Sequence, residues 1–246
     1  MSPNTRNAVQ IQRQYYTETA AQYDLMHSHE GDDDLNNLKF VLATLRVVDA
    51  QTVLDVGAGT GRGIRHLLNA IPSLSIRGIE PVAALIQQSV QRNGLQHGTI
   101  LQGSGDSLPF ADASFDVVCS FALLHHVPKP EAVVREMLRV ARKAVIIVDS
   151  NRFGQGKWPI RVLKHGLYKA GLWGLVNFLK SGGKGYLITE GDGLAYSYSV
   201  YDSFDQIAKW ARQIILIPTE PDYSRSWFHP LLTSAGVILC ALRDSV

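Results

Sequence analysis

Three glycines at two-residue spacing follow an apolar run and form a turn that could hold a small ligand. The run Val53-Leu54-Asp55-Val56 leads directly into Gly57-Ala58-Gly59-Thr60-Gly61. Glycines at such a turn let the backbone bend sharply and leave N–H groups bare to a ligand, and the N-terminus of a following helix favours a carboxylate. The next apolar run ends in Ile79-Glu80-Pro81, where a carboxylate can accept hydrogen bonds from both hydroxyls of a ribose. Together these residues predict a site for a nucleoside-containing cofactor.

The spacing of the glycines separates two classes of cofactor. A dinucleotide motif needs a third small residue three positions after its second glycine, and Arg62 occupies that position here. The pattern therefore favours a methyl donor over a nicotinamide or flavin dinucleotide. A glycine turn that binds no ligand is the structural alternative, but both the strand before the loop and the acid after it fit a cofactor site.

Two adjacent histidines follow the fourth apolar run. They lie in Leu123-Leu124-His125-His126-Val127. An imidazole with a pKa near 6.5 can take the proton of a hydroxyl that attacks a methyl group, so His125 and His126 are candidate catalytic residues. The alternative is that one or both cap the next helix or pack structurally. The segment His27-Ser28-His29-Glu30-Gly31-Asp32-Asp33-Asp34 carries metal-binding residue types, but its spacing fits no recognised site, so we predict a linker there and no metal.

The elements that position these residues alternate between strands and helices. We predict strands at 52–56, 74–79, 99–102, 115–120 and 144–149, and helices at 62–70, 83–92 and 131–142. This alternation indicates βαβ units on a parallel sheet, in which the carboxyl ends of the strands meet at one edge. Strand signals then return only at 214–217 and 237–242, which we expect to close the sheet as an antiparallel pair.

The glycine-loop segment 53–61 resembles the first motif of class I S-adenosylmethionine-dependent methyltransferases. Segments 103–110 and 114–118 resemble the adenine-binding region of the small-molecule, type 11 branch, as does 123–127. Tyr15-Tyr16 and 20–24 are similar to the segment that closes over the methionine end. The resemblance spans roughly Tyr15 to Asp149. It implies one Rossmann-like, doubly wound α/β domain with a seven-stranded sheet of order 3-2-1-4-5-7-6, the last strand antiparallel, and an inserted substrate lid.

The resemblance also implies roles for individual residues. Gly57 and its neighbours would hold the methionine portion of S-adenosylmethionine, Asp55 would orient it, and Glu80 would bind the ribose. Ser104 stands where the branch usually has an acidic or amide residue, so the adenine contact would weaken or pass to Asp106. His125 falls where plant phenolic O-methyltransferases carry a catalytic histidine. The complete predicted cofactor set is Tyr15, Tyr23, Asp55, Gly57, Ala58, Gly59, Gly61, Glu80, Pro81, Ser104, Gly105, Asp106, Ser107 and Phe121.

Four parts make up the predicted single domain of residues 1–246: a helical cap (1–48), the cofactor core (49–149), the lid (150–210) and the closing strands (211–246). Between residues 150 and 189 the chain has no acidic residue and seven basic ones. Aromatic residues alternate with these charges. Such a segment suits an anionic acceptor, a lipid-linked substrate or a peripheral membrane contact. The alternative is that the aromatics pack the insertion onto the core while the lysines are solvated.

The predicted function is S-adenosylmethionine-dependent methylation of a small molecule, most simply O-methylation of an anionic metabolite of sugar or lipid type. N- or C-methylation remains open, as does a protein that binds S-adenosylmethionine without turnover. A nucleic-acid methyltransferase is disfavoured, because the formal net charge is only +2 and no amino-methylating motif follows the fourth strand. The chain has no signal-like start and no apolar run of about 18 residues, so we expect a cytoplasmic protein.

Overall fold

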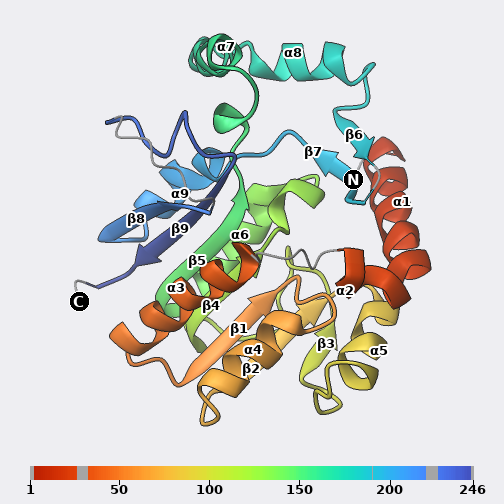
Figure 1. The fold of residues 1–246 in the computed structure, drawn as a ribbon, viewed down its shortest axis with the longest axis vertical. Helices are drawn as coiled ribbons and strands as arrows, with labels where there is room; N and C mark the ends of the chain where they lie inside the picture. The colour runs from red at the N-terminus through yellow and green to blue at the C-terminus, as the bar shows by residue number, and fades with distance from the viewer. Residues whose placement is uncertain (1–2, 27–32, 190, 220–226, 245–246) are drawn as a thin grey trace.

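The computed structural model describes residues 3–26, 33–189, 191–219 and 227–244. These residues form a seven-stranded sheet with helices on both faces (Figure 1). The strands are β1 (Thr52–Val56), β2 (Ser75–Glu80), β3 (Ile100–Gln102), β4 (Phe115–Phe121), β5 (Ala141–Ser150), β8 (Gln213–Pro218) and β9 (Gly236–Leu242). Their order is β3-β2-β1-β4-β5-β9-β8, and β9 is antiparallel to both neighbours, which confirms the predicted topology.

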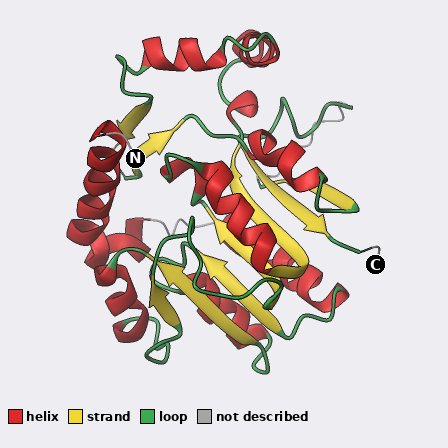
Figure 2. Cartoon of the chain, turned by 180° about the vertical axis from the view of Figure 1, so that it is seen from behind, coloured by secondary structure: helices red, strands yellow, loops and turns green. Residues whose placement is uncertain are grey.

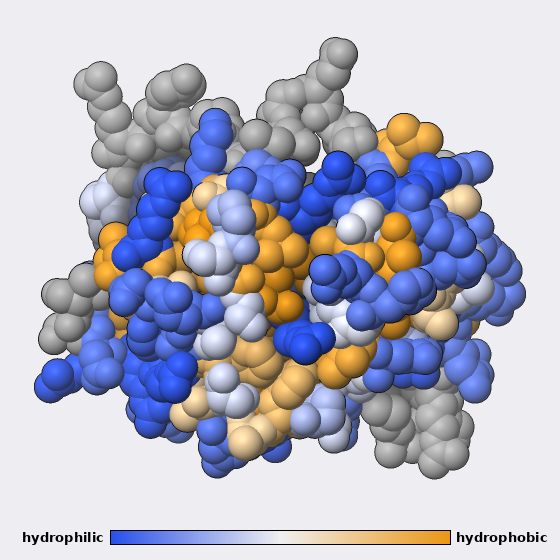
Figure 3. Space-filling model, turned by 90° about the horizontal axis from the view of Figure 1, so that it is seen from below, coloured by the Kyte–Doolittle hydropathy of each residue, from blue (hydrophilic) through white to orange (hydrophobic). Residues whose placement is uncertain are grey.

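Helices cover the two faces of the sheet and bury one apolar core on each. α3 (Asp33–Val47) and α4 (Arg62–Ala70) pack on one face, and α6 (Pro130–Val140) and α9 (Phe204–Ala208) pack on the other (Figure 2). The central strands β1, β4 and β5 are buried on both sides, which explains their nearly continuous apolar sequences. On the face seen from below (Figure 3), hydrophilic residues surround apolar ones near the centre of the view.

The boundary between α6 and β5 differs from its prediction, because Arg142 and Lys143 lie among the first residues of the strand and not at the end of the helix. α6 ends at Val140 and β5 begins at Ala141, whereas the sequence predicted a helix to Arg142 and a strand from Ala144. The Arg142 guanidinium donates to the buried Asp116 carboxylate at 2.9 and 3.0 Å, and the Lys143 amine lies 3.4 Å from it. These charges hide the start of the strand in the sequence, since buried strands are normally apolar there.

The insertion between β5 and β8 contains a second sheet that the sequence analysis missed. η3 (Arg152–Gly154), α7 (Trp158–Lys169) and α8 (Trp173–Lys180) lead to the hairpin of β6 (Tyr186–Thr189) and β7 (Gly193–Tyr196), and η4 (Val200–Ser203) precedes α9. The expectation that strands return only at residue 214 was therefore wrong. The hairpin lies in a glycine-rich stretch, and β6 exposes three of its four residues, so it has no alternating pattern.

The N-terminal segment packs beside this hairpin and beside α5 (Ala83–Gln91). α1 (Pro3–Thr19) runs along the side of the molecule next to β7 (Figure 1). η1 (Ala20–Gln22) and α2 (Tyr23–Met26) then bring the chain towards the glycine loop. The short helix η2 (Leu124–His126), which follows β4, also contacts β7. Segments far apart in the sequence thus converge at the carboxyl edge of the sheet.

Asn151 fixes the point where the insertion leaves β5. Its side chain is fully buried, and its Nδ2 donates to the carbonyls of Leu231 and Ser234, both at 2.8 Å. Its Oδ1 accepts from the Phe153 N–H and the Ser199 hydroxyl, both at 3.1 Å. One amide therefore connects η3, η4 and the segment before β9.

We expect Asn151→Asp to destabilise the protein by about 3 kcal/mol or more at pH 7, because a buried carboxylate cannot donate to those carbonyls. Urea unfolding would measure the change. Asn177→Asp is the matched control, since the Asn177 amide makes one hydrogen bond on the half-buried side of α8 and should cost less than about 1 kcal/mol. Equal stability of the two variants would contradict the anchoring role.

Candidate functional site

A cavity of about 330 Å³ opens at the carboxyl edge of the sheet, between the ends of β1, β2 and β4 and the inner side of α1. Nine of the predicted site residues line it: Tyr23, Gly57, Gly59, Glu80, Pro81, Ser104, Asp106, Phe121 and His126. The lining also includes Tyr16, which the sequence analysis placed in the segment that closes over the methionine end, and Gln12, Arg13 and Lys129, to which it assigned no role. The structure therefore brings together most of the site from four separate strand ends and one helix.

The glycine loop has backbone angles that favour glycine. Gly57, Gly59 and Gly61 have φ values of +79°, +54° and +74°. The N–H groups of Gly57 and Ala58 both donate to the Ile79 carbonyl, at 2.8 and 3.0 Å. The expectation that the loop presents bare N–H groups to a ligand is therefore wrong for these two residues. The loop instead offers close backbone approach, since Gly57 and Gly59 line the cavity and carry no side chain there.

Glu80 ends β2 and is held by the loop beside it. Its two carboxylate oxygens accept from the Gly59 N–H at 3.0 Å and the Val82 N–H at 2.9 Å. Burial raises the pKa of Glu80 to about 7, although both hydrogen bonds act in the other direction. The carboxylate still has unused lone pairs at the cavity wall, so it suits a ligand that brings hydroxyl donors.

Asp55 lies behind Glu80 and has an unsatisfied polar atom. The residue is buried, and its Oδ1 has no hydrogen-bond partner. Burial and then the nearby Glu80 charge raise the pKa of Asp55 to about 7. Asp55 does not line the cavity itself. Two buried acids side by side are costly unless donors or positive charge come near them. Glu80 is the one that lines the cavity, so the residues present fit a ligand that brings hydroxyl donors and positive charge, as the predicted donor does.

Three other predicted residues shape the site through packing, outside the cavity lining. A side chain at Gly61 would meet Leu95 at 2.4 Å, so this glycine lets the loop pack on the end of α5. A side chain at Gly105 would lie 2.8 Å from Val56. The Ala58 methyl fits against Gly78, where an added Cβ would be 2.8 Å away. Ligand contact by these residues stays a prediction.

Tyr15 and Ser107 also lie outside the lining. Tyr15 packs at β7, within 2.8 Å of a side chain added at Gly193, while its neighbour Tyr16 faces the cavity. Ser107 is exposed, and its N–H donates to the Ser104 carbonyl at 3.2 Å. Their contact with a cofactor stays a prediction as well.

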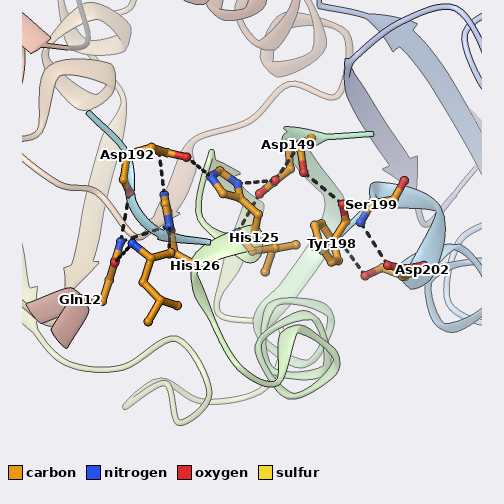
Figure 4. A network of polar contacts seen from close by, with 12 residues as sticks. Gln12, His125, His126, Asp149, Asp192, Tyr198, Ser199 and Asp202 are labelled. Carbon is orange, nitrogen blue, oxygen red and sulfur yellow. Dashed lines mark hydrogen bonds and ion pairs between the residues drawn. The ribbon is translucent and has the colours of Figure 1, made fainter. Parts of the chain in front are cut away.

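His125 is held between two carboxylates (Figure 4). Its Nδ1 donates to Asp149 Oδ1 at 2.7 Å, and its Nε2 lies 3.5 Å from Asp192 Oδ2. Burial lowers the pKa of His125, but the two carboxylates outweigh it and raise the value to about 10. His125 is therefore cationic at neutral pH and does not line the cavity, so in this arrangement it is a hydrogen-bond donor. Its predicted catalytic role stays untested.

His126 does line the cavity, and its ring is oriented by the β7 backbone. Nδ1 donates to the Leu194 carbonyl at 2.7 Å, which leaves Nε2 to face the Tyr16 hydroxyl at 3.1 Å and Asp192 Oδ1 at 3.3 Å. Burial raises the pKa of Tyr16, so this hydroxyl keeps its proton and can donate to a neutral imidazole. If Nε2 gains a proton, Asp192 can accept from it. The arrangement can therefore accept and stabilise one proton.

Gln12 and Asp192 complete this network and were missed from the sequence. Gln12 Oε1 accepts from the Leu194 N–H at 2.5 Å, which joins α1 to β7 (Figure 4). Asp149 was readable as the end of a predicted strand, since its position puts it at the ligand edge. Nothing in the sequence pattern pointed to Asp192 as a site residue, because the hairpin turn between β6 and β7 was not predicted.

The same residues have the donor types of a divalent metal site. Ligand atoms of His125, His126 and Asp192 lie within 4.8 Å of one another. Hydrogen bonds among the three already account for the arrangement, so a metal is not required. The segment 27–34 was predicted to be a linker without a metal, and its residues 27–32 lie outside the described residues.

Known proteins are similar to this chain in the sequence of its core and in its fold. A family model described as a methyltransferase domain matches residues 54–148. Phosphatidylethanolamine N-methyltransferase of Cereibacter sphaeroides is 34% identical over 116 residues, which cover 47% of this chain and 57% of that protein. Phthiotriol/phenolphthiotriol dimycocerosates methyltransferase 1 of Mycobacterium ulcerans is 30% identical over 115 residues, which cover 47% and 42%. The chain thus spans about half the length of these relatives.

A solved structure shows a similar fold over the whole chain. Magnesium protoporphyrin IX methyltransferase from Synechocystis PCC 6803, crystallised with bound SAH, superposes with a TM-score of 0.62 and 16% identity. The match covers 96% of this chain and 99% of that one. At this identity the likeness concerns the fold alone.

The buried acids give a testable pH dependence of stability. An aspartate has a pKa near 3.9 when unfolded, and Asp55 has about 7 when folded. The folded protein therefore binds more protons between about pH 4 and 7, and this group makes stability fall as the pH rises through that window. Asp55→Asn should remove the part of the fall that this group causes, about 4 kcal/mol at pH 8 and little at pH 4, while Glu80, whose folded pKa is also about 7, keeps its own part.

Urea unfolding at pH 4, 6 and 8 would measure this effect. Asp106→Asn, at an exposed carboxylate on the rim of the same cavity, is the control and should leave the pH dependence as in the wild type. A loss of stability at pH 8 in Asp55→Asn would show that Asp55 is satisfied in the folded state.

Proposed function

We propose that this protein, whose residues 54–148 match a methyltransferase-domain family model, is a class I S-adenosylmethionine-dependent methyltransferase that transfers the methyl group to an oxygen atom of an anionic small molecule of sugar or lipid type. The observation that carries the proposal is one cavity lined both by the glycine loop with Glu80 and by His126. The glycine loop and Glu80 suit the methyl donor, and His126 suits an acceptor that loses a proton.

Named residues of the cavity would hold the donor. Glu80 would bind the ribose hydroxyls, Gly57 and Gly59 would lie against the methionine portion, and Ser104 with Asp106 would meet the adenine. The donor supplies a methyl group already activated on a sulfonium. The protein therefore has to align the acceptor and exclude water. α1 serves this purpose, because Gln12 and Tyr16 attach its inner side to β7 and His126 over the cavity.

Two cations in the lining support an anionic acceptor. Arg13 from α1 faces the field of Glu80, whose pKa it lowers, and Lys129, from the segment before α6, is the cation that we propose meets the acceptor. Among the relatives, one is named for phosphatidylethanolamine and another for dimycocerosates, and the structural neighbour is named for a porphyrin. These names favour a lipid-type acceptor over a sugar. Because the relative named for phosphatidylethanolamine is an N-methyltransferase, N-methylation is the alternative, and identification of the product distinguishes the two.

His126 is the residue we propose to take the acceptor proton. Its Nδ1 donates to Leu194, so Nε2, which faces the Tyr16 hydroxyl and Asp192, is the nitrogen that would take the proton, and Asp192 would stabilise the imidazolium that forms. His125 would act as a positioning residue, because its cation holds Asp192 in place between the two rings.

The donor site is tested by calorimetric titration with S-adenosylmethionine and S-adenosylhomocysteine. We expect Glu80→Gln to weaken binding by about 10- to 100-fold, because an amide has one acceptor fewer and would turn a donor towards the Gly59 or Val82 N–H. Glu18→Gln, at an exposed position of α1, should bind as the wild type does. Unchanged affinity of the Glu80 variant would place the donor elsewhere.

The acceptor is sought with methyl-labelled S-adenosylmethionine and a panel of sugar phosphates and anionic phospholipid vesicles, and mass spectrometry of the product distinguishes O- from N-methylation. With the acceptor so found, we expect His126→Gln to lower kcat by about 100-fold and to change the affinity for S-adenosylhomocysteine less than about threefold. His97→Gln, an exposed histidine, is the control. Wild-type kcat in the His126 variant would refute the base assignment and leave the donor site untouched.

A further inference from the structure

α7 and α8 extend from the core and expose an apolar surface. They lie at the top of the molecule in Figure 1, beyond the end of the sheet. The described residues carry fourteen exposed large hydrophobic side chains, and ten of these lie between Trp158 and Ile188. Isolated exposed apolar residues are ordinary, whereas a concentration on two adjacent helices indicates a binding surface.

α7 turns its polar side inward and its apolar side outward. Arg161 donates to the Gly156 and Leu232 carbonyls at 2.6 and 3.0 Å, and Lys164 donates to the Arg152 carbonyl at 3.1 Å. Val162 and Leu163, on the other side of the helix, are 47% and 60% exposed. A surface helix of a water-soluble domain normally has the opposite arrangement.

α8 repeats this inversion. Its inner side carries Trp173, whose Nε1 donates to Ser197 Oγ at 3.1 Å, and Asn177, whose amide donates to the Gly185 carbonyl at 3.2 Å. Leu175, Phe178 and Leu179 face outward and are 59%, 53% and 69% exposed. Polar contacts, together with the packing of His165 and Tyr168 on the buried Phe153 ring, therefore fix both helices to the protein, and their apolar outer sides remain uncovered.

An aromatic cluster extends the surface at the start of α7. The Trp158 and Phe228 rings lie 5.2 Å apart, and Phe228 contacts Trp227 at 5.6 Å. Trp227 is 93% exposed. Tryptophan is the side chain most typical of the boundary between lipid and water, because its ring is apolar and its N–H is polar.

The charge of residues 150–189, which carry both helices, is uniformly positive. Lys157, Lys169, Lys180 and Lys184 are exposed near the ends of the two helices, and residues 150–189 contain no acid. Burial and then Lys180, with other cations nearby, lower the pKa of Lys164, which agrees with a positive field across both helices. Lysines that border an apolar face can place their stems on lipid and their amines at phosphates.

We propose that the outer faces of α7 and α8, with Trp158, Trp227 and Phe228, form a membrane-binding surface that docks on anionic lipid bilayers. A second copy of the chain fits this surface poorly, because pairing would bring like charges together. No helix of the described residues is long and apolar enough to cross a membrane, so the interaction is a shallow insertion of side chains. The surface connects to the donor cavity through β6 and β7, which carry Asp192 and Leu194 to His126.

Flotation of the purified protein with vesicles tests the proposal. The probes are phosphatidylcholine vesicles and phosphatidylcholine vesicles that contain phosphatidylglycerol, each at low and high salt. We expect flotation with the anionic vesicles that decreases with salt, and a blue shift of tryptophan fluorescence that Trp227→Ser diminishes. Lys169→Glu/Lys180→Glu should weaken binding at least about tenfold, and Leu163→Ser/Phe178→Ser should also weaken it.

Arg135→Glu/Lys209→Glu is the matched control, because it makes the same change of net charge at exposed positions of α6 and α9's end. It should float as the wild type does. Circular dichroism and thermal unfolding establish that each variant is folded, independently of methyl transfer. The proposal is overturned if the wild type does not float with anionic vesicles, or if Lys169→Glu/Lys180→Glu floats as well as the control variant does. It is also overturned if sedimentation shows that the wild type is a dimer and that Leu163→Ser/Phe178→Ser is a monomer, because this face would then join two copies of the chain.

Discussion

The buried carboxylate of Asp149 is the interaction on which the arrangement around the cavity depends. A carboxylate at the end of a central strand must find donors, because an unpaired buried charge costs several kcal/mol. Asp149 accepts from the Leu124 N–H, the His125 ring and the Ser150 N–H, each at 2.7 Å. These bonds fix η2, and through it they set the position of His126 at the cavity and the contacts that α1 and β7 make with it.

The site combines groups that stabilise the fold with groups that oppose it. Asp149 is fully satisfied, whereas burial raises the pKa values of Asp55 and Glu80 to about 7 and Asp55 Oδ1 has no hydrogen-bond partner. Such acids cost stability in the ligand-free protein, and a ligand that brought donors or positive charge to Glu80 at the cavity wall would offset part of that cost. Proteins commonly accept this cost at functional sites.

The insertion follows a different principle from the core. The core buries apolar residues on both faces of its strands, while α7 and α8 attach to the protein through polar and aromatic contacts and leave aliphatic side chains outside. Asn151 and Gly154 fix the point of departure, since a side chain at Gly154 would collide with the Ser234 backbone. The insertion thus has a defined origin and an uncovered outer face, both of which suit a segment that meets a partner.

The sequence by itself predicted the strands of the core and nine of the residues that line the cavity, because strand periodicity and the glycine loop are local signals that parallel topology brings to one edge. The full sheet order followed from the resemblance of these segments to a known family. Tertiary structure alone decided the rest. Asp192 and Gln12 reach the site through long-range packing of β7 and α1, which no local pattern encodes. The environment of His125, cationic between two carboxylates, and the outward apolar faces of α7 and α8 also depend on which neighbours surround a side chain, and that information exists only in the folded chain.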